Sequence, residues 1–258
     1  VNGVDSTFAN PDPLVQRNTG YSQMDLLQKI RYTPSIYVDW IINLQYSTSS
    51  PINRLDKLND YSGSDLKYAE YYYGPQNRLL ASLKNVLKKD NLFFTNLTSL
   101  LAFQKIDEDR YSRKFRLDEK LAQQEDVSVF SLNTDFLKVW GPSQKLNYGL
   151  ELNYNQVNSE AWYENIHNGE KTPAQTRYPE GGSYTWNASA YASYKWIISE
   201  KGVLNGGVRY SQAGLSSSFT AGILPYEEID INNGALTGSL GFKYTPNEKW
   251  QVNTIISS

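Results

Sequence analysis

The segment from Leu146 to Tyr154 constrains the fold of this chain more than any other stretch. Its apolar residues alternate one by one with polar or small residues, so Leu146, Leu150 and Tyr154 fall on one side of an extended chain and Glu151 on the other. A period of two residues places successive side chains on opposite faces of a β-strand. The pattern therefore predicts an amphipathic strand.

The segment from Trp186 to Ile198 repeats this pattern over a longer stretch. One face begins at Trp186 and continues through three alanines to Trp196, while Asn187 and Lys195 lie on the opposite face. Aromatic residues near both ends of an apolar strand face are typical of transmembrane β-barrels, whose strands meet lipid outside and water or polar groups inside. The rest of the chain can be compared with this expectation.

Composition excludes several classes of protein. The mean hydropathy is −0.56, and no apolar run in the sequence is long enough to form a membrane helix. A net charge of −2 provides no basic surface for nucleic acid, which is therefore not an expected partner. With no cysteine there is neither a disulfide framework nor a thiolate metal site. We predict no metal site and no cofactor.

Alternation and turn residues predict about ten antiparallel strands in five hairpins. The connections within hairpins are short, and those between hairpins are long or densely charged. The predicted hairpins are 24–32 with 38–46, 79–87 with 92–106, 127–140 with 146–154, 186–198 with 204–211, and 236–244 with 250–256. Long loops are expected at 48–77, 155–182 and 212–233, and a charged strand extension with a loop tip at 107–126.

The polar faces of these strands carry too much charge for the packed interior of a small closed barrel. Eight charged residues would point inward: Asp25, Lys29, Arg31, Asp39, Asp135, Glu151, Lys195 and Arg209. Burying each unpaired charge would cost several kcal/mol. A wide lumen avoids that cost and requires roughly 16 to 22 strands. We therefore predict an all-β fold, an antiparallel up-and-down transmembrane barrel of which this chain is one part.

Both ends of the chain fit a partial barrel. The first residues, from Val1 onward, have neither the charged nor the apolar region of a signal peptide. If the protein is exported, we expect its start to lie upstream. Ser258 falls inside a predicted strand, so further strands are expected to follow.

Three segments, 68–78, 207–211 and 231–239, resemble the β-barrel of TonB-dependent outer-membrane receptors of the kind common in Bacteroidetes. The resemblance implies that residues 1–258 are a segment of a barrel of about 22 strands in the outer membrane of a Gram-negative bacterium. It also implies a plug domain outside this sequence, through which the TonB–ExbB–ExbD complex drives import. The implied cargo is an iron-siderophore, haem or another bulky extracellular nutrient. The implied surroundings of the barrel are outer-membrane lipid.

Aromatic, basic and histidine residues in the predicted loops are the candidate ligand-binding groups, because loops on a rigid scaffold often carry recognition. The alternative for the aromatic rings is packing of one loop against another, and for the histidine a solvated position with no ligand role. The acidic runs at 107–109 and 118–119 match no calcium-loop spacing. The candidates are Tyr71, Tyr72, Tyr73, Trp162, Tyr163, His167 and Arg177.

Two other functions compete with transport. A soluble secreted β-protein that binds carbohydrate would show the same alternation. A ten-stranded outer-membrane protease would need a base held near a nucleophile at the barrel rim. The only histidine, His167, lies within a long predicted loop, and no nucleophile and base occupy complementary positions. We therefore predict no catalytic residue and no enzymatic activity.

Overall fold

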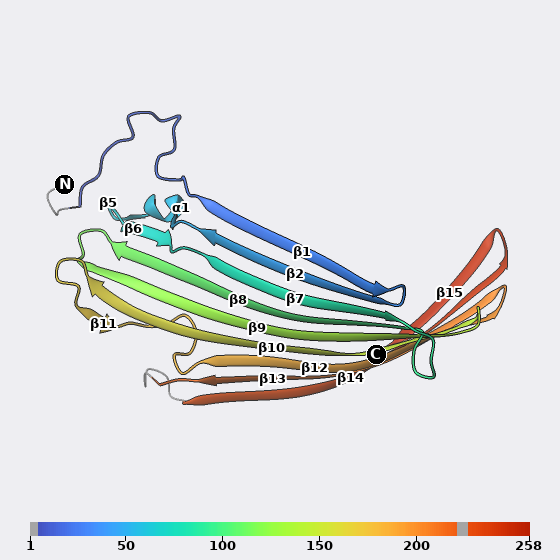
Figure 1. Ribbon diagram of the computed structural model, residues 1–258. Helices are drawn as coiled ribbons and strands as arrows, with labels where there is room; N and C mark the ends of the chain where they lie inside the picture. The colour runs from blue at the N-terminus through green and yellow to red at the C-terminus, as the bar shows by residue number, and fades with distance from the viewer. Residues whose placement is uncertain (1–4, 221–226) are drawn as a thin grey trace.

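The structure, a computed structural model, describes residues 5–220 and 227–258 and shows one long antiparallel sheet. Ten long strands follow one another in the order β1-β2-β7-β8-β9-β10-β12-β13-β14-β15 (Figure 1). The prediction of about ten strands is therefore confirmed. Their bounds are β1 (Gln23–Ser35), β2 (Val38–Ser49), β7 (Asn77–Lys88), β8 (Asn96–Lys114), β9 (Glu119–Trp140), β10 (Gln144–Asn165), β12 (Ser183–Ser199), β13 (Gly202–Ser218), β14 (Glu228–Asn247) and β15 (Trp250–Ser257).

Six short elements lie between the long strands. β6 (Tyr68–Tyr73) and β11 (Lys171–Pro173) pair with β8 and β10, and β3 (Ile52–Asn53) pairs with β6. β4 (Tyr61–Ser62) and β5 (Asp65–Leu66) form a separate hairpin, and α1 (Leu55–Leu58) is a single helical turn. The part of the chain described here contains no helix long and apolar enough to cross a bilayer.

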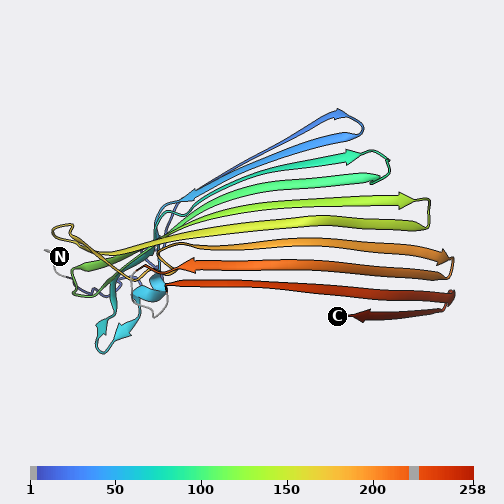
Figure 2. The same ribbon diagram turned by 90° about the horizontal axis from the view of Figure 1, so that it is seen from below.

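The sheet is a single curved layer with two different ends (Figure 2). One end, the short-turn end, has the tight connections inside each hairpin. The other, the long-loop end, has the short elements and the longer connections (Figure 1). β1 and β15 are the two edges and do not pair with each other. In the described residues the sheet is therefore open and is not a closed ten-stranded barrel.

The strand register separates an apolar face from a polar face. The apolar face is defined by Leu150 and the residues in register with it; Leu150 pairs with Ala190, and Ala190 pairs with Tyr210. Leu150 and Leu240 remain 52% and 54% exposed, so no second protein layer covers this face in the described residues. Glu151, on the polar face of the same strand, is less exposed than its neighbour Leu150. This difference fits a concave polar face and a convex apolar face.

The eight charged residues predicted to face inward do share one face. Arg31 and Glu151, for example, lie in one row across the sheet. Each residue of this row pairs directly with the next: Arg31, Ile41, Lys84, Leu100, Asn133 and Glu151. Arg31 binds Asp39 at 2.9 Å, and Arg209 binds Glu151. Pairing of this kind reduces the cost of bringing charge into the barrel wall.

The strands extend well beyond their predicted ends at the long-loop end. β10 continues to Asn165, so the first part of the loop predicted at 155–182 is a strand. β9 begins at Glu119, before its predicted start at residue 127. The alternation fails there because the apolar face of β10 becomes polar after Tyr154, with Gln156 and Glu160 in line with it. Backbone pairing between β9 and β10 nevertheless continues without a shift.

Two other predicted loops contain more regular structure than expected, and the charged segment agrees with its prediction. The loop predicted at 48–77 contains β3, α1, β4, β5 and β6. The charged segment 107–126 is a strand extension with a short tip, as predicted, and β8 ends at Lys114. The loop predicted at 212–233 is shorter, because β13 runs to Ser218 and β14 starts at Glu228; residues 221–226 lie outside the described residues.

One glycine on the polar face is required by close packing between strands. Gly149 pairs directly with Tyr191, and an added Cβ would lie 2.3 Å from the carbonyl oxygen of Thr134 and 2.7 Å from the hydroxyl of Tyr191. Tyr191 also donates a hydrogen bond to Asp135. An aromatic ring over a glycine compensates for the missing side chain in a strand.

If the apolar face meets lipid, Leu150→Arg in the full-length protein should lower the free energy of unfolding by about 2–4 kcal/mol, the cost of a cation near the bilayer centre. Asn153→Arg, on the polar face of the same strand, is the matched control and should cost much less. Denaturant titrations of protein refolded into phospholipid vesicles measure both values. Equal costs for the two variants would contradict the assignment of faces.

Candidate functional site

The predicted binding residues cluster at the long-loop end, where β8, β9 and β10 extend past the apolar band. β6 lies beside the extension of β8, and β11 beside that of β10 (Figure 1). Gly74 makes the first of these contacts possible. Its N–H donates to the carbonyl of Asp109 at 2.8 Å, and an added Cβ would lie 2.6 Å from the Asp109 Cβ. A larger residue would push β6 away from β8.

The three consecutive tyrosines are in a strand rather than a loop, so their rings alternate between faces. Tyr72 stacks on Tyr111, with ring centroids 5.0 Å apart and an interplanar angle of 21°. Burial raises the pKa of both Tyr72 and Tyr111. Tyr71 instead meets Tyr68 edge to face at 5.0 Å. The three rings therefore do not form one continuous platform.

Tyr73 lies between two guanidinium groups. The Cζ atoms of Arg54 and Arg110 are each 5.1 Å from its ring centroid, a distance at which a cation is attracted to an aromatic ring. Arg54 also donates to the Tyr73 hydroxyl and pairs with Asp56. The Nε of Arg110 is buried and has no hydrogen-bond partner. Arg110 is thus a cation whose hydrogen-bonding capacity is not fully used.

Trp162 and Tyr163 are also strand residues, and they point to opposite faces of β10. Trp162 lies in one row with Ala122 and Tyr111, which continues the apolar face, and the Nζ of Lys171 is 4.2 Å from its ring centroid. Tyr163 pairs with Leu121 on the continuation of the polar face and is 39% exposed. Only Tyr163 of this pair shares a face with Tyr71.

Arg177 holds the connection between β10 and β12 against the polar face. Its Nη1 lies 2.9 Å from Glu125 and 3.5 Å from Glu108. The side chain of Glu125 is only 3% exposed and also accepts a hydrogen bond from Ser159 at 3.3 Å. Burial opposes the charge of Arg177, but the two carboxylates raise its pKa overall. These contacts indicate a structural role for Arg177; its role in ligand binding stays a prediction.

His167 is in a turn at the outermost tip of the sheet. Its backbone N–H donates to the Asn165 side chain at 2.9 Å, and its Nε2 is 3.2 Å from the Asp118 carboxylate. The ring is 57% exposed. Within residues 5–220 and 227–258, no group of three potential ligands could hold a metal ion. The position of His167 resembles a solvated turn more than a ligand site.

The structure therefore places a subset of the predicted residues on one face, with Tyr163 in the same row as Tyr71 but three strands away. Tyr71, Tyr73, Tyr163 and Arg177 share the continuation of the polar face, whereas Tyr72 and Trp162 lie on the other face and His167 at the tip. Arg54 and Arg110 belong to the same surface but were not predicted. Extending the alternation of β8 from Gln104 through Glu108 would have placed Arg110 there; Arg54 gave no such signal. We call Arg54, Tyr71, Tyr73, Arg110 and Tyr163 the rim cluster.

The segment before β1 is tied to the same end of the sheet. The carboxylate of Asp5 accepts two hydrogen bonds of 2.8 Å from Arg113, and Arg113 also binds Glu70 at 2.8 Å. The backbone N–H of Arg116 donates to Asp5 at 2.7 Å. Hydrogen bonds from Arg113 lower the pKa of Asp5, although burial opposes this effect. The start of the chain thus packs on the β8–β9 tip, several strands away from β1.

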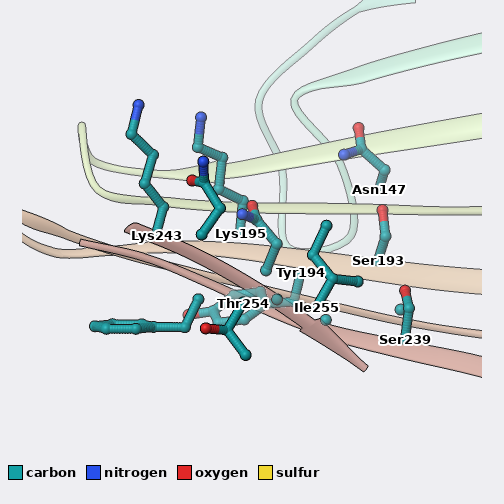
Figure 3. A pocket seen from close by; sticks show the side chains of 14 residues that line it. Asn147, Ser193, Tyr194, Lys195, Ser239, Lys243, Thr254 and Ile255 are labelled. Atoms are coloured by element: carbon teal, nitrogen blue, oxygen red, sulfur yellow. The ribbon is translucent and has the colours of Figure 1, made fainter. Parts of the chain in front are cut away.

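A hollow of about 490 Å³, the short-turn hollow, lies at the short-turn end. Lys195 and Lys243 extend from the same side of the sheet, and Asn147 lines the same hollow farther along (Figure 3). Lys145 pairs directly with Lys195, and none of the three lysines has an ion pair among the described residues. Like charges directly opposite one another destabilise a sheet. This part of the polar face is therefore suited to an anionic or acidic neighbour.

The contact between Asp5 and Arg113 should depend on pH. A lowered carboxyl pKa contributes stability above the ordinary value of about 3.9, and this stability is lost as the pH falls through the lowered pKa. We expect a fluorophore on Ser6→Cys to report an immobile segment from pH 7 to about 4 and release at lower pH. Asp5→Asn should release the segment already at pH 7; an unchanged signal would exclude this contact.

Breaking the Arg177 contact should loosen the loop but leave the sheet intact. Glu125→Gln removes the buried charge that Arg177 needs, at a cost of roughly 1–3 kcal/mol. Hydrogen exchange in full-length protein should accelerate at residues 174–180 and remain unchanged in β12 and β13. Glu119→Gln, an exposed carboxylate on the same strand, is the control. Equal exchange in both variants would mean that Arg177 does not hold the loop.

Comparisons with known proteins identify the fold of the chain. No protein-family model matches the sequence, and no curated protein is similar to it. Among solved structures, the copper transporter OprC matches 88% of this chain with a TM-score of 0.67 and 13% identity. The ferric citrate transporter FecA matches 94% (0.61, 15%), and the ferric yersiniabactin uptake receptor FyuA from Yersinia pestis matches 91% (0.60, 15%).

The chain spans 35%, 36% and 37% of the lengths of these three proteins. At such low identity the comparison establishes the fold, and none of the three supports an origin in Bacteroidetes. The three are named as transporters or receptors and not as enzymes. The open sheet, its two faces and its extended long-loop end correspond to one segment of their barrel. The chain thus has the β-barrel fold of TonB-dependent outer-membrane receptors, an architecture of the Gram-negative outer membrane.

Proposed function

We propose that the whole protein is a TonB-dependent receptor that imports a bulky metal chelate, of the iron-siderophore class, across the outer membrane of a Gram-negative bacterium. The fold supports nutrient uptake. The named cargoes of similar structures, copper, ferric citrate and ferric yersiniabactin, support a metal complex. Because this chain covers about a third of those proteins, cargo and partners of the whole protein are part of the proposal.

The rim cluster is the observation that carries the choice of cargo. It combines two guanidinium groups with three tyrosines on the face that continues into the lumen. Guanidinium groups bind carboxylates and other anions, and aromatic rings pack against flat organic ligands. Arg54 is already paired with Asp56, whereas Arg110 has no ion pair among the described residues, so Arg110 is the cation of the cluster that we expect to bind an anionic chelate.

The surroundings of the barrel follow from its two faces. The exposed apolar face suits outer-membrane lipid. Lys195 and Lys243 in the short-turn hollow, with Lys145 paired to Lys195 beside it, support an acidic surface inside the lumen, which fits a plug domain contributed by another part of the protein. Coupling to TonB–ExbB–ExbD would act through that plug and belongs to the same proposal.

The other candidate functions have less support. A soluble carbohydrate-binding protein would have to cover the apolar face, but Leu150 and Leu240 are exposed. A ten-stranded protease would have to close, but β1 and β15 are unpaired edges in the described sheet. Haem as cargo rests on His167, which is exposed at the tip and close to Asp118 rather than to the rim cluster. We therefore favour a siderophore over haem.

The proposal predicts that the rim cluster controls binding. In the full-length protein, Arg110→Ala should weaken the best ligand in a panel of ferric catecholate, hydroxamate and citrate complexes about tenfold or more. Lys171→Ala, on the opposite face, is the control.

Tryptophan fluorescence titration measures binding, and uptake of the radiolabelled complex by iron-starved cells measures transport. Binding of no metal chelate in the panel, by a wild-type protein that is folded in the outer membrane, would contradict the proposed cargo. Equal affinity of Arg110→Ala and Lys171→Ala would contradict the role of the rim cluster.

A further inference from the structure

The turn between β7 and β8 lies on the apolar face rather than beyond the end of the sheet. The Tyr148 hydroxyl donates to the carbonyl of Phe93 at 2.9 Å, and the Phe94 ring lies 5.9 Å from that of Phe136. These contacts are with β9 and β10, so residues 89–95 lean sideways across two neighbouring strands. Leu92 and Phe93 at the top of this turn are 83% and 69% exposed.

A buried lysine fixes the turn in this position. Lys138 donates to the Asp90 carboxylate at 2.7 Å and to the carbonyl of Asn91, and its side chain is only 9% exposed. The Asn91 side chain also accepts hydrogen bonds from the backbone N–H groups of Phe93 and Phe94, at 2.8 and 3.0 Å. The turn is thus held by several directional bonds, and its two exposed apolar side chains have a defined place.

A groove of about 740 Å³ runs beside this turn. Its floor is Ala190 and Ala192 on β12, where small side chains leave space between larger neighbours. Leu92, Phe93, Tyr148 and Leu150 form one wall, and Val208, Tyr210 and Leu236 form the other. No charged residue lines it. The groove opens onto the same surface as the exposed leucines of the apolar face.

The width of the groove selects its occupant. The strands that carry its walls, β10 and β13, are separated only by β12, so their backbones are about 10 Å apart. An α-helix with its side chains has a diameter of about 10–12 Å and cannot enter once the wall side chains occupy part of that width. A single hydrocarbon chain is narrower and needs no polar partner. Lys89, exposed at the base of the turn and without an ion pair among the described residues, could meet a phosphate.

We propose that this groove binds one acyl chain of a phospholipid from the periplasmic leaflet, with the Leu92–Phe93 turn as its side wall. The inference rests on the proposed orientation of the barrel, in which the short-turn end faces the periplasm. The turn and the alanine floor then act together: the turn inserts its two apolar side chains among the lipid tails, and the floor accommodates one tail next to them. The lipid becomes part of the outer wall of the barrel at β10, β12 and β13.

Native mass spectrometry of the full-length receptor, extracted in a mild detergent, tests the proposal by counting retained phospholipid. The wild type should retain one phospholipid. Ala190→Phe fills the floor and should reduce the retained fraction about tenfold, the change expected when roughly two methylene groups lose their burial. The double variant Leu92→Ser, Phe93→Ser should have the same effect. Ala188→Phe is the matched control, because Ala188 shares strand and face with Ala190 but does not line the groove.

The outcomes are distinct. Heat-modifiable migration on gels verifies that each variant is folded. Retention by Ala188→Phe together with loss by Ala190→Phe and by the double variant supports the site. Equal phospholipid retention by all four proteins, no retention by the wild type, or retention of lipopolysaccharide in place of phospholipid would overturn it. Unchanged chelate uptake by Ala190→Phe cells would show that receptor function stands independently, whereas a wild-type protein absent from the outer membrane would overturn both proposals.

Discussion

Continuous hydrogen bonding between neighbouring strands is the constraint on which the rest of this structure depends. From β9 through β14 the register shifts only near the β12–β13 turn, so each backbone group in the band finds its partner on the adjacent strand. A bilayer offers no water to unpaired N–H and C=O groups, which restricts spanning sheets to closed barrels. In the described residues, β1 and β15 each have one strand partner only, so the sheet is open.

The same register gives each residue its surroundings. Because neighbours in one row share a face, the alternation of one strand is copied across the sheet, and Leu150, Ala190 and Tyr210 become one row of the apolar face. The polar face collects charge, part of which is neutralised by pairs such as Arg209 with Glu151. Lys145 and Lys195 pair directly and are not neutralised within the described residues, so an acidic group from another part of the protein would stabilise the sheet there.

The residues proposed to bind the cargo lie where the strands leave the apolar band. There β8, β9 and β10 keep their hydrogen bonds but no longer alternate between apolar and polar residues, and short elements pack on them. Arg177 and Asp5 fasten distant segments to this extension through buried or half-buried ion pairs. Four of the five rim-cluster residues are thus on strands, and only Arg54 comes from a connection, between β3 and α1.

The sequence by itself determined the fold class, the number of long strands, the short turns and the inward position of the eight charges. These features depend on a local period of two, which any strand within the band must satisfy. Only the tertiary structure decided where the strands end, because beyond Tyr154 the apolar face is interrupted by Gln156, Asn158 and Glu160 and the backbone pairing with β9 keeps the chain extended. Consecutive rings such as Trp162 and Tyr163 therefore separate onto opposite faces, and Arg54 joins Tyr73 and Arg110 from a segment that carries no periodic signal. Such contacts arise between strands far apart in sequence, and no local pattern contains them.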